Sequence, residues 1–115
     1  MFHQVLKLYI QNDILTNKDF NYYGSIGVDQ ILIQASDRIQ REKNPAQYYN
    51  NRQRFKTYII KERTDSGIIA LYGPAARQGE IGDKLCIISY AFINHSENES
   101  LKPKIILVDQ RNKPL

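Results

Sequence analysis

Short runs of β-branched and aromatic residues, separated by turn residues, recur along the 115-residue chain and constrain its fold most strongly. Residues 5–10 alternate between apolar and polar side chains, which is the period of a half-buried strand. Further strands are predicted at residues 54–60, 68–72, 85–93 and 104–108, with weaker extended segments at 20–23 and 47–49. Residues 16–19 are predicted to form a turn. The pattern indicates a small, mostly-β barrel or sandwich of about seven strands.

A short helix is expected after Asp29, a good helix cap, because apolar residues follow it at helical spacing. The members of this repeat are Ile31, Leu32, Ala35 and Ile39. Polar residues and then Pro45 end it. The length fits one domain, residues 1–115, with no internal repeat or linker.

Composition excludes several classes of protein. No apolar run is long enough to span a bilayer, and the N-terminus lacks the pattern of a signal peptide, so the cytoplasm is the expected location. The single cysteine, Cys86, allows no internal disulfide and is predicted to be buried. His3 and His95 are far apart and no metal-binding spacing is present, so no metal is expected. A Ser-His-Asp triad stays open on spacing, although its usual G-x-S-x-G context is missing.

The formal net charge of +4 raises the question of a nucleic-acid partner. The basic residues are scattered, however, and no nucleic-acid module is recognisable, so none is expected. A mildly basic surface explains the charge, and some of these residues are available to hold an anionic small molecule.

The segment Tyr22–Ser25 is, on local grounds, an ordinary turn, because glycine reaches positive φ and serine bonds to nearby backbone. Taken alone, Tyr58 would be a packing aromatic and Arg54 a solvated charge at a strand end. These local interpretations do not take the spacing between the segments into account.

Four blocks, in their order and spacing, resemble the aspartate 1-decarboxylase family of pyruvoyl-dependent enzymes: Tyr22–Ser25, Arg54–Tyr58, Gly73–Ala76 and Ile81–Asp83. The resemblance runs from about Val5 to Val108 and includes Asp29-Gln30 and the closing segment Lys102–Asp109. It implies a six- to seven-stranded double-psi β-barrel with short helices. It also implies a homotetramer with active sites between subunits.

The resemblance further implies that the chain is a zymogen that cuts itself between Gly24 and Ser25 into chains 1–24 and 25–115. The serine hydroxyl attacks the preceding carbonyl, and the resulting ester eliminates and hydrolyses to a pyruvoyl group. Glycine leaves that carbonyl unshielded and tolerates strain. Thr57 matches the residue that donates to the developing oxyanion.

In the family the pyruvoyl ketone forms a Schiff base with the substrate amine and accepts electrons as carbon dioxide leaves. The implied reaction converts L-aspartate to β-alanine for pantothenate and coenzyme A. Arg54 matches the residue that binds a substrate carboxylate, and Tyr58 matches the proton donor. The remaining residues assigned to substrate binding are Thr57, Gly73, Pro74 and Ala75, with Tyr22, Tyr72 and Tyr9 as further candidates.

Four positions depart from the family pattern. Tyr9 stands where the family has a lysine, Tyr72 where it has an asparagine, and Arg52 where a loop glycine is usual. Lys7 shares a strand face with Tyr9 and is available to replace part of that lysine's role. Pro74 replaces an alanine and removes a backbone N–H from the pocket rim. Losing a charge-assisted hydrogen bond typically costs about 1.5–3 kcal/mol, so weaker recognition of a dicarboxylic amino acid is expected.

Two alternatives therefore remain beside aspartate decarboxylation. The first keeps the pyruvoyl chemistry but acts on another amino acid. The second is an uncleaved barrel with a structural or regulatory binding role. Maturation assisted by a helper protein, as in some family members, is also open.

Overall fold

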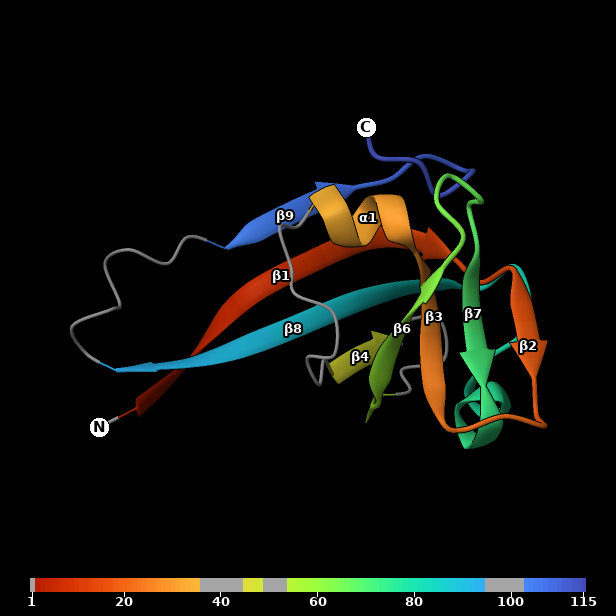
Figure 1. Cartoon of the computed structure of the whole chain (residues 1–115), viewed down its shortest axis with the longest axis horizontal. Coiled ribbons are helices and arrows are strands. Elements are labelled where there is room, and N and C mark those ends of the chain that lie inside the picture. The colour runs from red at the N-terminus through yellow and green to blue at the C-terminus, as the bar shows by residue number, and fades with distance from the viewer. Residues whose placement is uncertain (1, 36–44, 49–53, 95–102) are drawn as a thin grey trace.

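Two curved β-sheets pack around one apolar core in the computed structural model, which describes residues 2–35, 45–48, 54–94 and 103–115 (Figure 1). The larger sheet has the strand order β5 (Arg54–Lys56), β4 (Pro45–Tyr48), β8 (Lys84–Asn94), β1 (Phe2–Ile14) and β9 (Lys104–Leu107). β1 pairs antiparallel with β8 and parallel with β9, so it lies inside the sheet.

The smaller sheet has the strand order β2 (Asn17–Asp19), β7 (Ile69–Tyr72), β3 (Ser25–Asp29) and β6 (Tyr58–Glu62). β3 runs parallel to β6 and antiparallel to β7. In Figure 1 these four strands stand together at one end of the long ribbon formed by β1 and β8. One face of β3 and β7 enters the core through Ile26, Val28, Ile69 and Leu71, which are fully buried.

Burial follows the alternation that the sequence predicts for the first strand. Leu8 and Ile10 are buried in the core, whereas Tyr9 and Gln11 between and after them are half-buried. Asn12, with φ of 68°, lies in the irregularity where the pairing of β1 with β8 shifts register. Asparagine tolerates this left-handed conformation better than most residues.

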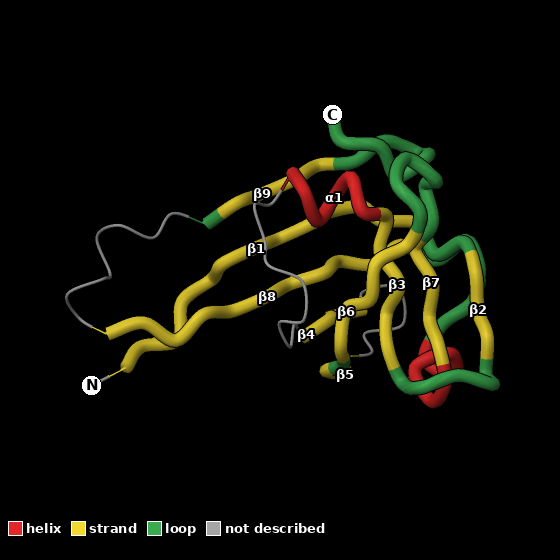
Figure 2. The backbone as a smooth tube through the Cα atoms, viewed as in Figure 1, coloured by secondary structure: helices red, strands yellow, loops and turns green. Residues whose placement is uncertain are grey.

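Two short helices complete the described structure, α1 (Gln30–Ala35) and the 3₁₀ helix η1 (Gly73–Gln78) (Figure 2). The predicted cap of α1 is confirmed, because Asp29 Oδ1 accepts the backbone N–H of Ile31 at 2.9 Å. Ile39, the last residue of the predicted repeat, lies outside the described residues. No helix in the described part of the chain is both long and apolar enough to cross a membrane.

The prediction of a mostly-β chain with short helices is confirmed, and the arrangement is compatible with a small double-psi β-barrel. Nine strands are described where six or seven were expected. One reason is that the strand predicted over residues 54–60 is interrupted at Thr57. Its first part, β5, belongs to the larger sheet and its second part, β6, to the smaller one, so the chain changes sheet at this residue.

The assignments on either side of Asp19 were wrong. Residues 17–19, predicted as part of a turn, form β2, because they pair in parallel with Ala70–Tyr72 of β7. Residues 20–23, predicted to be extended, form a bend. A pairing with a strand about fifty residues away decides this local structure, and turn-like composition does not record it.

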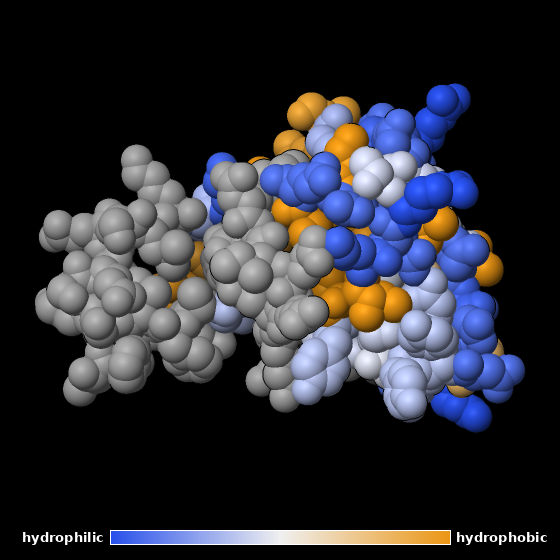
Figure 3. Space-filling view, in the orientation of Figure 1, coloured by the Kyte–Doolittle hydropathy of each residue, from blue (hydrophilic) through white to orange (hydrophobic). Residues whose placement is uncertain are grey.

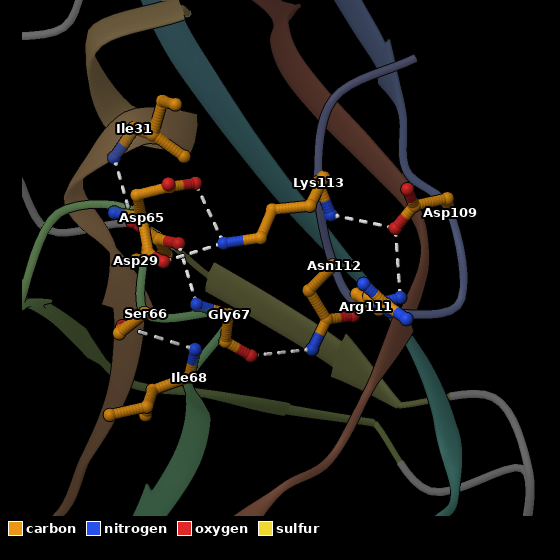
Figure 4. A network of polar contacts seen from close by, with 10 residues as sticks. All are labelled: Asp29, Ile31, Asp65, Ser66, Gly67, Ile68, Asp109, Arg111, Asn112 and Lys113. Atoms are coloured by element: carbon orange, nitrogen blue, oxygen red, sulfur yellow. Dashed lines mark hydrogen bonds and ion pairs between the residues drawn. The ribbon is translucent and has the colours of Figure 1, made fainter.

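Polar contacts fix the end of β3 that lies away from Ser25 (Figure 4). The buried Asp29 carboxylate accepts the backbone N–H groups of Asp65 and Gly67, each at 2.8 Å, as well as that of Ile31. Asn112 donates to the carbonyl of Gly67 at 2.9 Å and so adds the C-terminal turn to this network. The network therefore joins β3, α1 and two turns at one point.

Candidate active site

Ser25 lies at the start of β3, between β6 and β7, and is 3% exposed. In the register of the smaller sheet it pairs with Tyr58 of β6 on one side and with Tyr72 of β7 on the other. Directly paired residues project to the same face of a sheet. The two tyrosines therefore flank Ser25 on the face opposite to the apolar core.

The Ser25 side chain turns back toward the segment that precedes it. Its hydroxyl donates a hydrogen bond to the carbonyl oxygen of Tyr23 at 3.0 Å. The hydroxyl is thus turned toward the segment that precedes Ser25, in which Gly24 is exposed. A nucleophile held beside the preceding peptide is what an acyl shift between adjacent residues requires.

The start of η1 packs closely against this same segment. A Cβ on Gly73, whose φ is 62°, would lie 2.5 Å from the carbonyl oxygen of Tyr22 and 2.8 Å from the nitrogen of Gly24. Pro74 Cδ would lie 3.5 Å from a Cβ on Gly24. Glycine at position 73 is therefore required both by its backbone conformation and by this contact. The sequence-predicted segment Gly73–Ala75 does meet the Gly24–Ser25 segment, with Ala75 buried behind it.

Exposed aromatic rings surround the buried serine. Tyr22 is 55% exposed, Tyr23 is 86% exposed and Tyr58 is 53% exposed. The ring of Tyr22 lies 5.0 Å from that of Tyr72, centroid to centroid. Figure 3 shows apolar atoms at the surface in the region of β6, bordered by more hydrophilic residues. The Ser25 face is therefore rich in accessible aromatic and apolar surface.

Glu62 is part of this face and was not recognised from the sequence. The Tyr72 hydroxyl donates a short hydrogen bond to Glu62 Oε1. Burial, followed by this hydrogen bond, raises the pKa of Tyr72 above its ordinary value. Continuing the alternation of Tyr58 and Ile60 along β6 leads to Glu62, which was the available signal.

For Thr57 and Arg54 the structure gives the position of the backbone. Thr57 is half-buried and directly precedes Tyr58, the residue that pairs with Ser25. Arg54 begins β5 and pairs with Gln47 of β4 in the larger sheet. Its side chain lies outside what the structure describes.

Tyr9 lies on β1 of the larger sheet, and its hydroxyl contacts two residues of the same sheet. Its hydroxyl accepts from the Cys86 thiol at 3.4 Å and from Gln11 Nε2 at 3.5 Å. Cys86 is 5% exposed, which confirms its predicted burial, and this burial raises the pKa of its thiol. Within one chain the described contacts thus connect Tyr72 with the Ser25 segment and connect Tyr9 with Cys86. A side chain for Lys7 is not described.

The residues around Ser25 fit a pyruvoyl group formed at that position. Ser25 is shielded from solvent, and Gly27, two residues further along the same face, adds no side chain beside it. The two flanking tyrosines offer polar hydroxyl groups on a largely aromatic wall. No group of three metal-ligating side chains occurs among the described residues.

Comparison with known proteins gives a full-length match. The family model described as aspartate decarboxylase matches residues 1–115. The aspartate 1-decarboxylase of Kosmotoga olearia is 43% identical over 115 residues, covering 100% of this chain and 98% of that protein. That of Caldicellulosiruptor bescii is 41% identical over 113 residues, covering 98% and 88%. That of Cupriavidus necator is 43% identical over 108 residues, covering 94% and 90%.

Proposed function

Because the chain belongs to the aspartate decarboxylase family, we propose that it converts L-aspartate to β-alanine and carbon dioxide, using a pyruvoyl group made from Ser25. The observation that supports this proposal is the position of Ser25. It is buried between Tyr58 and Tyr72 with its hydroxyl turned toward the preceding peptide. β-Alanine is then available for pantothenate and coenzyme A.

Maturation begins at the Gly24–Ser25 bond. Ser25 Oγ attacks the Gly24 carbonyl carbon, and the C–N bond breaks as the ester C–O bond forms. Loss of the Ser25 α-proton then breaks the Cβ–Oγ bond, which releases a carboxylate on Gly24 and leaves dehydroalanine at residue 25. Addition of water and release of ammonia give the pyruvoyl group. Thr57, the residue before Tyr58, donates to the carbonyl oxygen as it gains negative charge.

The pyruvoyl group supplies the electron-withdrawing carbonyl that lets an amino acid lose carbon dioxide. Arg54 binds a substrate carboxylate through its planar guanidinium. The Tyr58 hydroxyl supplies the proton that replaces the lost carboxylate on the substrate α-carbon. Gly73, Pro74 and Ala75 form the wall next to the residue 22–24 segment and orient the substrate.

Aromatic exposure supports assembly into a homotetramer with active sites at contacts between copies. Tyr22, Tyr23 and Tyr58 are each more than half exposed around a buried serine, and a second copy would cover them. The proposed enzyme acts in the cytoplasm. A helper protein that accelerates cleavage belongs to the same proposal.

One observation favours a different amino acid as substrate. Glu62 brings a carboxylate to the Ser25 face, and negative charge there disfavours a substrate with a second carboxylate. Carbon dioxide release from L-aspartate, compared with release from amino acids with uncharged side chains, separates the two substrate classes. Faster release from an uncharged amino acid would replace aspartate in the proposal and leave the pyruvoyl chemistry in place.

Intact-mass analysis tests the maturation itself. The purified chain, heated alone or with an extract of the producing cells, is expected to give fragments 1–24 and 25–115. The larger fragment should be lighter by one ammonia than a fragment that begins with serine. Ser25→Ala should give one full-length mass and no turnover. An uncut wild-type chain under both conditions would instead favour a non-catalytic barrel.

A further inference from the structure

Glu62 and Tyr72 meet above the strand that carries Ser25. Glu62 ends β6 and Tyr72 ends β7, and these strands lie on opposite sides of β3. The Tyr72 hydroxyl donates to the Glu62 carboxylate across Gly27. A Cβ on Gly27 would overlap that carboxylate and would lie 2.8 Å from Tyr72 Cε2. The absence of a side chain at residue 27 is therefore what allows the two residues to meet.

Tyr72 continues this connection to the segment before Ser25. Its ring packs against the ring of Tyr22 with centroids 5.0 Å apart and an interplanar angle of 47°. The next residue along the chain, Gly73, packs against the backbone of residues 22–24. Tyr72 thus contacts this segment through its side chain and is linked to it again through its neighbour.

The hydrogen bond gives the Tyr72 ring one defined orientation. Tyr72 is half-buried, and its hydroxyl donates a hydrogen bond to the Glu62 carboxylate. Without an acceptor at residue 62, the backbone of Tyr72 would stay in the sheet, but its hydroxyl would lose the hydrogen bond that fixes the ring. The position of Tyr22, and with it the Tyr23 carbonyl that binds the Ser25 hydroxyl, would become less defined.

We propose that Glu62 is a positioning residue for self-cleavage, an inference that rests on the proposed function. Through Tyr72 it holds the residue 22–24 backbone where the Gly24 carbonyl carbon lies within reach of Ser25 Oγ. Small misplacements of reacting atoms slow intramolecular reactions strongly, by as much as about 100-fold for a shift of about 1 Å. Removing the hydrogen bond should therefore slow cleavage about 10- to 100-fold.

Cell-free synthesis followed by intact-mass analysis measures the cleavage rate from an uncut start. Glu62→Ala and Tyr72→Phe should both be slow, and the double variant should be no slower than the slower single variant. Glu62→Gln keeps an acceptor oxygen and should recover most of the rate. Lys61→Ala, an exposed neighbour on the opposite face of β6, is the matched control and should cut like the wild type. Thermal unfolding of each variant in a Ser25→Ala background shows whether the uncut fold is intact.

The outcomes separate the two proposals. A wild-type chain that is not cut, even with cell extract, overturns the proposed function. If the wild type and Tyr72→Phe are cut at the same rate, the role of Glu62 is overturned and the proposed function stands. If Glu62→Ala fails to fold, Tyr72→Phe still decides, because it removes the same hydrogen bond and keeps the packed ring.

Discussion

Asp13 is a buried carboxyl whose two oxygens have no hydrogen-bond partner among the described residues, which is unusual for a side chain that is 0% exposed. It lies on β1 opposite Leu85 of β8, after the irregularity at Asn12. Burial raises the pKa of the Asp13 carboxyl well above its ordinary value. Between the ordinary pKa and the raised one, the folded protein therefore keeps a proton that the unfolded chain releases.

This proton links stability to pH with a definite sign. Above the ordinary aspartate pKa the unfolded chain binds fewer protons than the folded one, so Asp13 makes the protein less stable as pH rises toward the raised pKa. Asp13→Asn removes this dependence. As pH rises above the ordinary aspartate pKa, the wild type should lose stability relative to the variant, by up to about 1.4 kcal/mol per pH unit, until the raised pKa is passed. Urea unfolding at several pH values measures the difference.

Asp109→Asn is the matched control for Asp13→Asn. Backbone N–H groups of Lys113 and Arg111 lower the pKa of the exposed Asp109 carboxyl. Its contribution is therefore present above the ordinary pKa and is lost as pH falls through the lowered one, the opposite sign to Asp13. A flat difference between wild type and Asp13→Asn would show that the Asp13 carboxyl is not buried without a partner in solution.

At the scale of elements, Asp29 joins β3, α1 and the turn at residues 65–67 through three backbone hydrogen bonds. In Asp29→Asn the amide group would have to face one of these N–H donors. Losing a buried hydrogen bond to a charged acceptor costs about 1.5–3 kcal/mol, so unfolding free energy should fall by about that amount. Cleavage should slow only if the Asp29→Asn substitution also displaces β3. Denaturant unfolding of the uncut Ser25→Ala form measures the loss.

Asp65→Asn tests the same chemical change in an exposed part of the same network. Asp65 pairs with Lys113 at 2.7 Å, and asparagine accepts its positive φ of 63°. An exposed ion pair contributes about 0–1 kcal/mol, so this variant should be close to wild type. Equal losses in the two variants would contradict a special role for Asp29.

Alternation along the chain was enough to predict most strands, because one face of each is buried in a common core. β8 appears nearly as predicted because its apolar run is long, whereas β1 runs from Phe2 to Ile14 and so extends well beyond the predicted residues 5–10. The break at Thr57 could not be predicted, because β-branched and aromatic residues continue through it and local propensity does not record a change of sheet. β2 was missed for the related reason that its pairing partner is distant.

The candidate site shows the same division. Motif spacing was enough to propose Ser25, Thr57, Tyr58 and Gly73 as one group. That Ser25 sits between Tyr58 and Tyr72 depends on a parallel and an antiparallel register, which only the folded sheets define. Glu62 carries no motif at all. Its connection to the site appears because Gly27 leaves space between two neighbouring strands.

At the scale of the whole molecule, the bond proposed to break does not divide the fold into two parts. The N-terminal side of that bond contributes β1, which lies between β8 and β9 and makes ten register pairs with β8 alone. It also contributes β2, which pairs with β7. Leu8, Ile10 and Leu15 add three buried side chains to the common core. Chain 1–24 therefore contributes an interior strand to the larger sheet and the edge strand β2 to the smaller one.

Cleavage should accordingly leave the two chains associated. After complete cutting, gel filtration under native conditions should give one peak that contains both fragments, at the elution volume of the uncut Ser25→Ala form. The fragments should separate only in denaturant, because β1 cannot leave without breaking two strand pairings and exposing core residues. Hydrogen exchange should show β1 amides protected in both the cut and uncut forms. Loss of chain 1–24 on the native column would contradict the interior position of β1 in the mature protein.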